Sequence, residues 1–194
     1  DVASYIAENY LAFLDGSKPL TEWDSYVAGL KAIGEGAFMG ASSLESIDLS
    51  KTQIDVIPEY AFAGASALKE VKLPATLTGI GNYAFRDAGI ESIEITTSIT
   101  DIGYGAFENS GLKTLTIAQD HPMTNLGEAS DVITPISWQM LPAASGDYNL
   151  FAGTTQLETV TIPNTVTSIE KNTFKNSGIQ TLMMSDPTAD SSLN

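Results

Sequence analysis

His121 is the only histidine of the chain, and the chain contains no cysteine. A Ser-His-Asp triad would have to use His121, yet the adjacent Asp120 cannot be the separate third group that orients the imidazole. Because Pro122 makes the local chain a turn, the sequence predicts a histidine in a surface loop rather than a catalytic one. The lack of cysteine and of a second histidine also excludes thiolate catalysis and metal sites built on several such residues.

Other catalytic and cofactor-binding chemistry needs patterns that the sequence does not contain. Glycoside cleavage requires two carboxylates that face each other, and nothing pairs any two of the 24 Asp and Glu residues in that way. There is no EF-hand loop, calcium-binding nonapeptide, P-loop or dinucleotide fingerprint. We therefore expect no catalytic residue, no metal and no cofactor.

The composition describes one acidic domain with a substantial core. The 194 residues are 43% hydrophobic, and 9 basic against 24 acidic residues give a net charge of −15. Such a surface repels nucleic acid and anionic lipid. No apolar run approaches the roughly 18 to 20 residues of a membrane span. The chain opens without a signal-peptide pattern, so we expect either a cytosolic protein or one whose leader is absent from this chain.

The chain is organised by an internal repeat of 22 to 24 residues, with one interval of 44. Six of the seven phenylalanines mark the units, at Phe38, Phe62, Phe85, Phe107, Phe151 and Phe174. An isoleucine lies five residues before every one of them except Phe151, where Gly146 takes its place. An aliphatic residue and then a pair two residues apart follow each phenylalanine, so a unit reads I-x4-F-x4/5-L-x2-I-x-L.

The final pair of each unit predicts a short strand that is too short to be stable alone. Stacking the units pairs each strand with its copies and piles the Ile, Phe and Leu positions into one core. We therefore predict an α/β repeat fold, a right-handed leucine-rich-repeat solenoid of about six or seven coils with short parallel strands.

At this motif, over about residues 30–185, the sequence resembles the BspA-type, or treponemal-class, leucine-rich repeat of bacterial surface proteins. The resemblance implies a bacterial protein that is secreted or surface-attached, and a role in adhesion to host proteins or other cells. It also implies that the repeats carry no catalytic residues.

The segments that flank the repeats are expected to differ from them. Residues 1–29 contain two amphipathic patterns and predict a helical N-terminal cap. Residues 186–194 form a polar C-terminal tail with no matching cap. The tail could cover the last coil, molecules could self-associate there, or the chain could be part of a longer one.

The long interval, residues 118–149, has two interpretations. It could be a degenerate coil, with a strand at Ile136–Leu141, or an inserted loop, and we favour a degenerate coil that carries a loop. The segment holds Trp138, Tyr148 and His121, which we predict to bind a partner. Trp138 could equally fill the gap left by the missing phenylalanine.

The open face of the predicted sheet is the usual recognition surface of a solenoid. Its side chains are mostly Ser and Thr, without aromatic residues, and its candidate partner-binding residues are Asp48, Lys72, Glu94, Thr116 and Thr161. The sequence thus predicts a non-catalytic cell-surface or secreted module for recognition or adhesion, whose partner is a protein such as a host surface or matrix protein. The alternatives are a structural spacer or self-associating unit, and a glycan-binding accessory protein.

Overall fold

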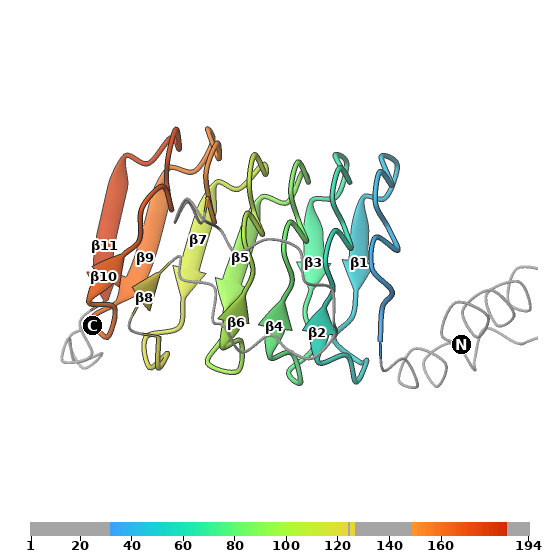
Figure 1. Ribbon diagram of the computed structural model, residues 1–194, viewed down its shortest axis with the longest axis horizontal. Coiled ribbons are helices and arrows are strands. Elements are labelled where there is room, and N and C mark those ends of the chain that lie inside the picture. The colour runs from blue at the N-terminus through green and yellow to red at the C-terminus, as the bar shows by residue number, and fades with distance from the viewer. Residues whose placement is uncertain (1–31, 124, 127–148, 186–194) are drawn as a thin grey trace, which may run out of the picture.

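The computed structural model describes residues 32–123, 125–126 and 149–185, which form two layers of short parallel strands (Figure 1). The first layer contains β1 (Ser46–Asp48), β3 (Glu70–Lys72), β5 (Ser92–Ile95), β7 (Thr114–Ile117), β9 (Thr159–Pro163) and β11 (Thr181–Ser185). The second contains β2 (Val56–Ile57), β4 (Gly79–Ile80), β6 (Asp101–Ile102), β8 (Asn125–Leu126) and β10 (Ser168–Ile169).

Successive strands of each layer lie side by side, so the chain is a parallel-strand β-solenoid. In the first layer β5, β7, β9 and β11 form one continuous sheet and β1 pairs with β3. In the second layer β2, β4 and β6 form one sheet and β8 pairs with β10. Six first-layer strands are joined by five turns of the solenoid. The predicted stacking of short parallel strands is confirmed.

The described residues contain no helix, which corrects the α/β class expected for the repeats. The reason lies in the arc, the segment around each repeat phenylalanine that leads to the next first-layer strand. The residues two before and two after it have positive φ in every unit, and helices do not accommodate such residues in their interior. They are Gly36, Gly40, Tyr60, Gly64, Tyr83, Asp87, Gly105, Asn109, Asn149, Gly153, Asn172 and Asn176. The helical cap predicted over residues 1–29 lies outside the described residues.

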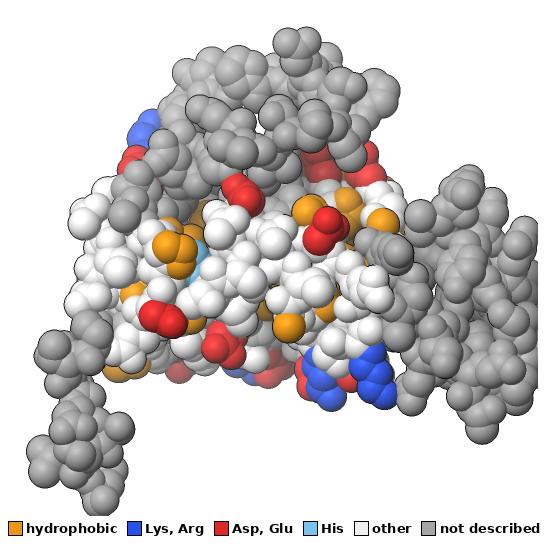
Figure 2. Space-filling view, turned by 90° about the horizontal axis from the view of Figure 1, so that it is seen from below, with side chains coloured by type: hydrophobic (Ala, Val, Ile, Leu, Met, Phe, Trp, Pro, Cys, Tyr) orange, Lys and Arg blue, Asp and Glu red, His pale blue; other side chains and the backbone are white. Residues whose placement is uncertain are grey.

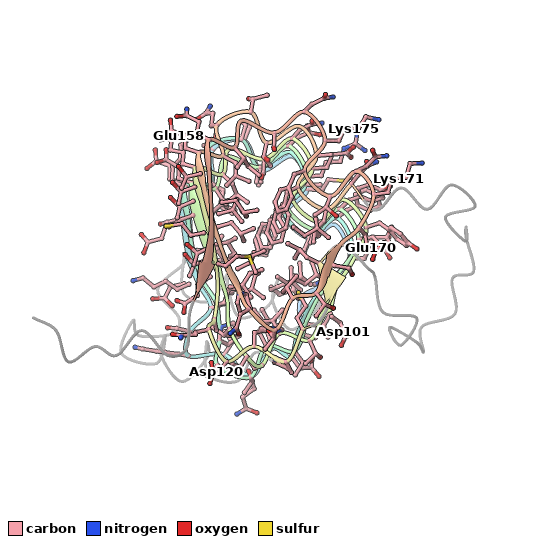
Figure 3. The ribbon with its side chains drawn as sticks, turned by 90° about the vertical axis from the view of Figure 1, so that its left-hand side faces the viewer. Asp101, Asp120, Glu158, Glu170, Lys171 and Lys175 are labelled. Atoms are coloured by element: carbon pink, nitrogen blue, oxygen red, sulfur yellow. The ribbon has the colours of Figure 1, made fainter. Side chains whose placement is uncertain are left out.

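A single column of phenylalanine rings runs through the core. Neighbouring rings from Phe38 to Phe174 stack with centroids 5.1–5.5 Å apart and planes within 12°. The four inner rings are fully buried, and Ile, Leu and Ala columns pack around them. Figure 3 shows these side chains filling the space between the two layers.

The 44-residue interval is an insertion within one turn and not an extra coil. β7 pairs directly with β9, and Phe107 stacks on Phe151 at 5.3 Å, so no further unit separates them. Leu126 in β8 is fully buried and takes the core position that Ile102 holds one unit earlier. Leu126 is 25 residues before Phe151, against five for Ile102 and Phe107, so about 20 residues are inserted after the core position is filled. This corrects the interpretation as a degenerate coil; the strand expected at Ile136–Leu141 lies outside the described residues.

The length of the arc after each phenylalanine decides where glycine is required. Three arcs are one residue shorter than the others, and each has a glycine just before the aliphatic residue that packs in the core: Gly89, Gly111 and Gly178. A Cβ at Gly89 would lie 2.2 Å from the carbonyl oxygen of Ser66, and one at Gly178 would lie 2.1 Å from that of Thr155. The shorter arc therefore brings the backbones of two units into contact.

We expect Gly89→Ala to lower the free energy of unfolding by about 1–3 kcal/mol, because the clash is with backbone and a whole arc must shift. Gly34→Ala is the matched control, since a Cβ there meets no atom within 4 Å. Urea denaturation of the two variants measures the difference. Equal stabilities would contradict the close approach.

The phenylalanine column predicts a second difference in stability. Phe85→Ala removes an inner ring with no exposed surface and should cost about 3–5 kcal/mol, the usual range for a buried Phe→Ala change. Phe38→Ala should cost clearly less, because Phe38 ends the column and is only partly buried. Chemical denaturation of both variants tests this, and equal losses would argue against a core that is continuous across the units.

Candidate functional site

His121 is a core residue and not a surface-loop residue, which corrects the sequence-based prediction. Its side chain is 1% exposed and takes the place held by Ile99 in the preceding unit and Val166 in the next. Its Nδ1 accepts a hydrogen bond from the Met123 amide at 3.0 Å, so the neutral ring carries its proton on Nε2 and donates to the Ile99 carbonyl at 2.9 Å. These bonds satisfy a polar ring in an apolar column, and they leave His121 inaccessible to a partner.

Three other buried polar side chains also bond to the backbone, whereas the buried Ser110 hydroxyl has no hydrogen-bond partner among the described residues. The hydroxyls of Thr52, Thr154 and Thr173 donate to carbonyl oxygens three residues earlier at 2.7–2.8 Å. No group of three or more His, Cys, Asp or Glu residues is placed to hold a metal within the described residues. The same part of the chain contains no helix able to span a membrane. Figure 2 shows carboxylates scattered over one edge of the molecule rather than gathered around a hollow.

The structure places the residues predicted for the open sheet face together on the first layer. Asp48 is in register with Lys72, Glu94 with Thr116, and Thr116 with Thr161. Lys72 Nζ lies 3.6 Å from Asp48 Oδ2, and both side chains are more than half exposed. Hydrogen bonds from Ser50, with the charge of Lys72 as a smaller cause, lower the pKa of Asp48. The face is charged at the β1 end and rich in threonine toward β11.

The insertion is attached to the opposite layer. It leaves the described chain after Leu126 in β8 and returns at Asn149, two residues before Phe151. In Figure 3, Glu158 lies at the edge of the first layer, while Glu170 and Lys171, next to β10, lie on the other side of the core. Trp138 and Tyr148 lie outside the described residues. Of the predicted contact residues, the structure thus places only the five of the first layer on a surface.

A pair of tyrosines on the second side of the solenoid was not anticipated from the sequence. Tyr60 and Tyr83 stack with ring centroids 5.3 Å apart and planes 13° apart. Arg86 lies over Tyr83, with its Cζ 5.5 Å from the ring centroid, and its Nε is 3.4 Å from carboxylate oxygens of Asp87 and Glu108. Both tyrosines are two residues before a repeat phenylalanine, and that shared offset was the signal available in the sequence.

Carboxylates adjoin the other side of this pair. Burial, and then the nearby charge of Glu35, raise the pKa of Glu59. Burial, and then the charge of Glu59, raise the pKa of the Tyr60 hydroxyl. The Gly36 amide donates to the Glu59 carbonyl oxygen at 3.0 Å, so Glu35 and Glu59 are neighbours in successive units and their carboxylates repel each other.

The last coil presents an apolar end. Ile169, Leu182 and Met184 are 43%, 49% and 52% exposed, although Leu182 aligns with the buried Val160 of the preceding strand. They line a hollow of about 290 Å³ together with Ile162 and Val166. Figure 1 places β11 at one end of the row of strands.

Two stacked layers, one aromatic column and no catalytic group among the described residues define a solenoid repeat protein. The family model of the BspA type leucine rich repeat region matches residues 25–130 and 145–191 with six copies. The chain therefore belongs to the BspA-type leucine-rich repeat family. The repeat fold of this family is typically a binding scaffold without catalytic activity.

Solved structures agree with this fold. A leucine-rich repeat protein from Bacteroides ovatus ATCC 8483 has a TM-score of 0.58 and 21% identity, over 79% of this chain and 40% of that one. The pneumococcal vaccine antigen PcpA has a TM-score of 0.55 and 22% identity, over 73% of this chain and 31% of that one. A leucine rich cell surface protein from Faecalibacterium prausnitzii A2-165 has a TM-score of 0.46 and 20% identity, over 77% and 44%.

The chain thus spans less than half the length of each of these three proteins. No curated protein matches the sequence.

Proposed function

We propose that the chain is a non-catalytic recognition or adhesion module of the bacterial cell surface or exterior, which binds a protein partner. Membership of the BspA-type family supports a surface module for protein interaction. The likeness to a vaccine antigen is compatible with this location. Trp138 and Tyr148 of the insertion are the main proposed contacts, and Asp48, Lys72, Glu94, Thr116 and Thr161 of the first layer are secondary ones.

The observation that carries this proposal is the position of the insertion. About 20 residues leave the solenoid after Leu126, yet the phenylalanine column continues from Phe107 to Phe151 without a gap. The core therefore does not need the inserted residues. Long insertions on one face of a repeat scaffold commonly serve binding.

The double variant Trp138→Ala with Tyr148→Ala should bind a partner about tenfold more weakly or worse, because large aromatic anchors dominate protein interfaces. The measurement is affinity for a panel of purified host matrix and cell-surface proteins, with the melting temperature as a check on folding. Ser46→Ala with Ser92→Ala is the matched control, because both serines are exposed on the first layer and neither is a proposed contact, and it should change affinity little. Unchanged affinity in the aromatic variant would contradict the assigned site.

The apolar last coil favours a second candidate function, self-association into a structural unit. A second copy would cover Leu182 and Met184 and pair with the free edge of β11. This end also suits contact between acidic chains, because residues 149–185 carry two Lys, two Glu and no net charge.

Light scattering at increasing concentration should detect dimers of the native chain and only monomers of Leu182→Lys with Met184→Lys. Met39→Lys is the matched control, since Met39 is 63% exposed near the other end of the described solenoid. A native chain that stays monomeric at high concentration would rule out this candidate.

A further inference from the structure

Tyr60 and Tyr83 occupy a backbone position that suits glycine or asparagine. Both have a φ of 54°, in the left-handed region that is unfavourable for a bulky side chain. The corresponding residues of the other four units are Gly36, Gly105, Asn149 and Asn172. Strain of this kind, retained in two adjacent units, points to a role for the side chains themselves.

The core does not require the two tyrosines. The phenylalanine column is equally regular in units that carry glycine or asparagine at this position, with ring distances of 5.3 Å and 5.4 Å between the last three rings. Gly105 also leaves room for its neighbour, because a Cβ there would lie 2.6 Å from the ring of Tyr83. The pair is therefore an addition to the surface, accommodated by a glycine in the next unit.

Among the described residues, one face of the pair is left open to a ligand. Tyr83 is covered by Tyr60 on one side and by Gly105 and Arg86 on the other. The unit before Tyr60 has Gly36, and a Cβ at Gly36 would meet only Met39 within 4 Å. That unit therefore supplies no side chain at position 36 to cover the face of Tyr60 turned away from Tyr83. Met39, 63% exposed, adds a flexible apolar group beside it.

The charge around the free ring face selects a cation. Glu35 and Glu59 adjoin Tyr60, and no basic side chain of the described residues forms an ion pair with either. The nearby Arg86 is already engaged with Asp87 and Glu108. An aromatic face beside unpaired carboxylates attracts an ammonium or guanidinium group through the ring quadrupole and the negative charges.

We propose that Tyr60, Tyr83, Glu35, Glu59 and Met39 form a second interaction surface, which binds a basic segment of a protein partner. A Lys or Arg side chain lies on the free face of Tyr60 with its charge against the two carboxylates. This inference rests on the proposed function as a protein-binding module and adds the chemistry of the partner. The net charge of −15 speeds the encounter with a basic protein and disfavours an acidic one.

The probes are an oligolysine and an oligoarginine peptide, with an oligoglutamate peptide as the negative probe. Their affinities are measured by fluorescence anisotropy on the full chain at about 150 mM salt, where distant surface charges are screened. Tyr60→Asn with Tyr83→Asn tests the rings, because asparagine occupies the same backbone position in two other units. Glu59→Gln tests the charge, and Glu45→Gln removes an equal charge from an exposed position next to the first layer as the matched control.

We expect the tyrosine variant and Glu59→Gln each to weaken basic-peptide binding about tenfold, and Glu45→Gln about twofold or less. The tyrosine variant should keep the melting temperature of the native chain or raise it, since asparagine relieves the backbone strain. Equal losses for Glu59→Gln and Glu45→Gln, or native affinity in the tyrosine variant, would overturn the site.

Two further outcomes separate this inference from the function on which it rests. If the native chain binds matrix or cell-surface proteins but no basic peptide, the function stands and the inference fails. If it binds basic peptides through Tyr60 but no protein of the panel, the proposed function loses its support while the surface stands. Tyrosine-dependent binding of a neutral oligosaccharide without peptide binding would make the pair a glycan platform and overturn the assignment.

Discussion

The structure depends on one constraint: parallel strands in successive turns lie about 4.8 Å apart, so every side chain of a unit faces its own copy in the next. Flat rings satisfy this spacing well, and the six phenylalanines stack at 5.1–5.5 Å with nearly parallel planes. Each unit buries its apolar side only against its neighbours, which makes stability a property of the stack. A polar residue can join a buried column only when its hydrogen bonds are met, as His121 shows.

Charges obey the same spacing. The residue before each first-layer strand from β1 to β9 alternates in sign through Glu45, Lys69, Glu91, Lys113 and Glu158. Lys113 Nζ lies 2.8 Å from Glu91 Oε2 and Lys69 Nζ 3.6 Å from Glu91 Oε1, and the hydrogen bond from Lys113 is the main reason that the pKa of Glu91 is lowered. Such exposed pairs contribute little stability each, but like charges at this distance would oppose stacking. Glu35 and Glu59 are an exception to this alternation, because they occupy the same position in two successive units and repel each other beside Tyr60.

In such a scaffold, the positions that do not pack in the core columns are available for function. The arcs and the turns between layers tolerate insertion because loop closure becomes only slowly more costly with length. The inserted segment begins after Leu126 has filled its column, and the tyrosine pair uses a backbone position where two units have glycine and two have asparagine. Neither feature interrupts the phenylalanine column.

The sequence by itself determined the period, the phenylalanine column and the strand of each unit, because a side chain that recurs at the length of one turn must meet its copy. Only the tertiary structure decided which residues fill the columns where the period breaks. Leu126 replaces an isoleucine two positions beyond the place that counting predicts, and His121 replaces an aliphatic residue at the counted place. The second-layer strands have only two residues each, which is too short for a recognisable sequence pattern. The stacking of Tyr60 on Tyr83 depends on a left-handed backbone at both residues. These features depend on contacts between neighbouring turns, which residue types and spacing in a single chain do not specify.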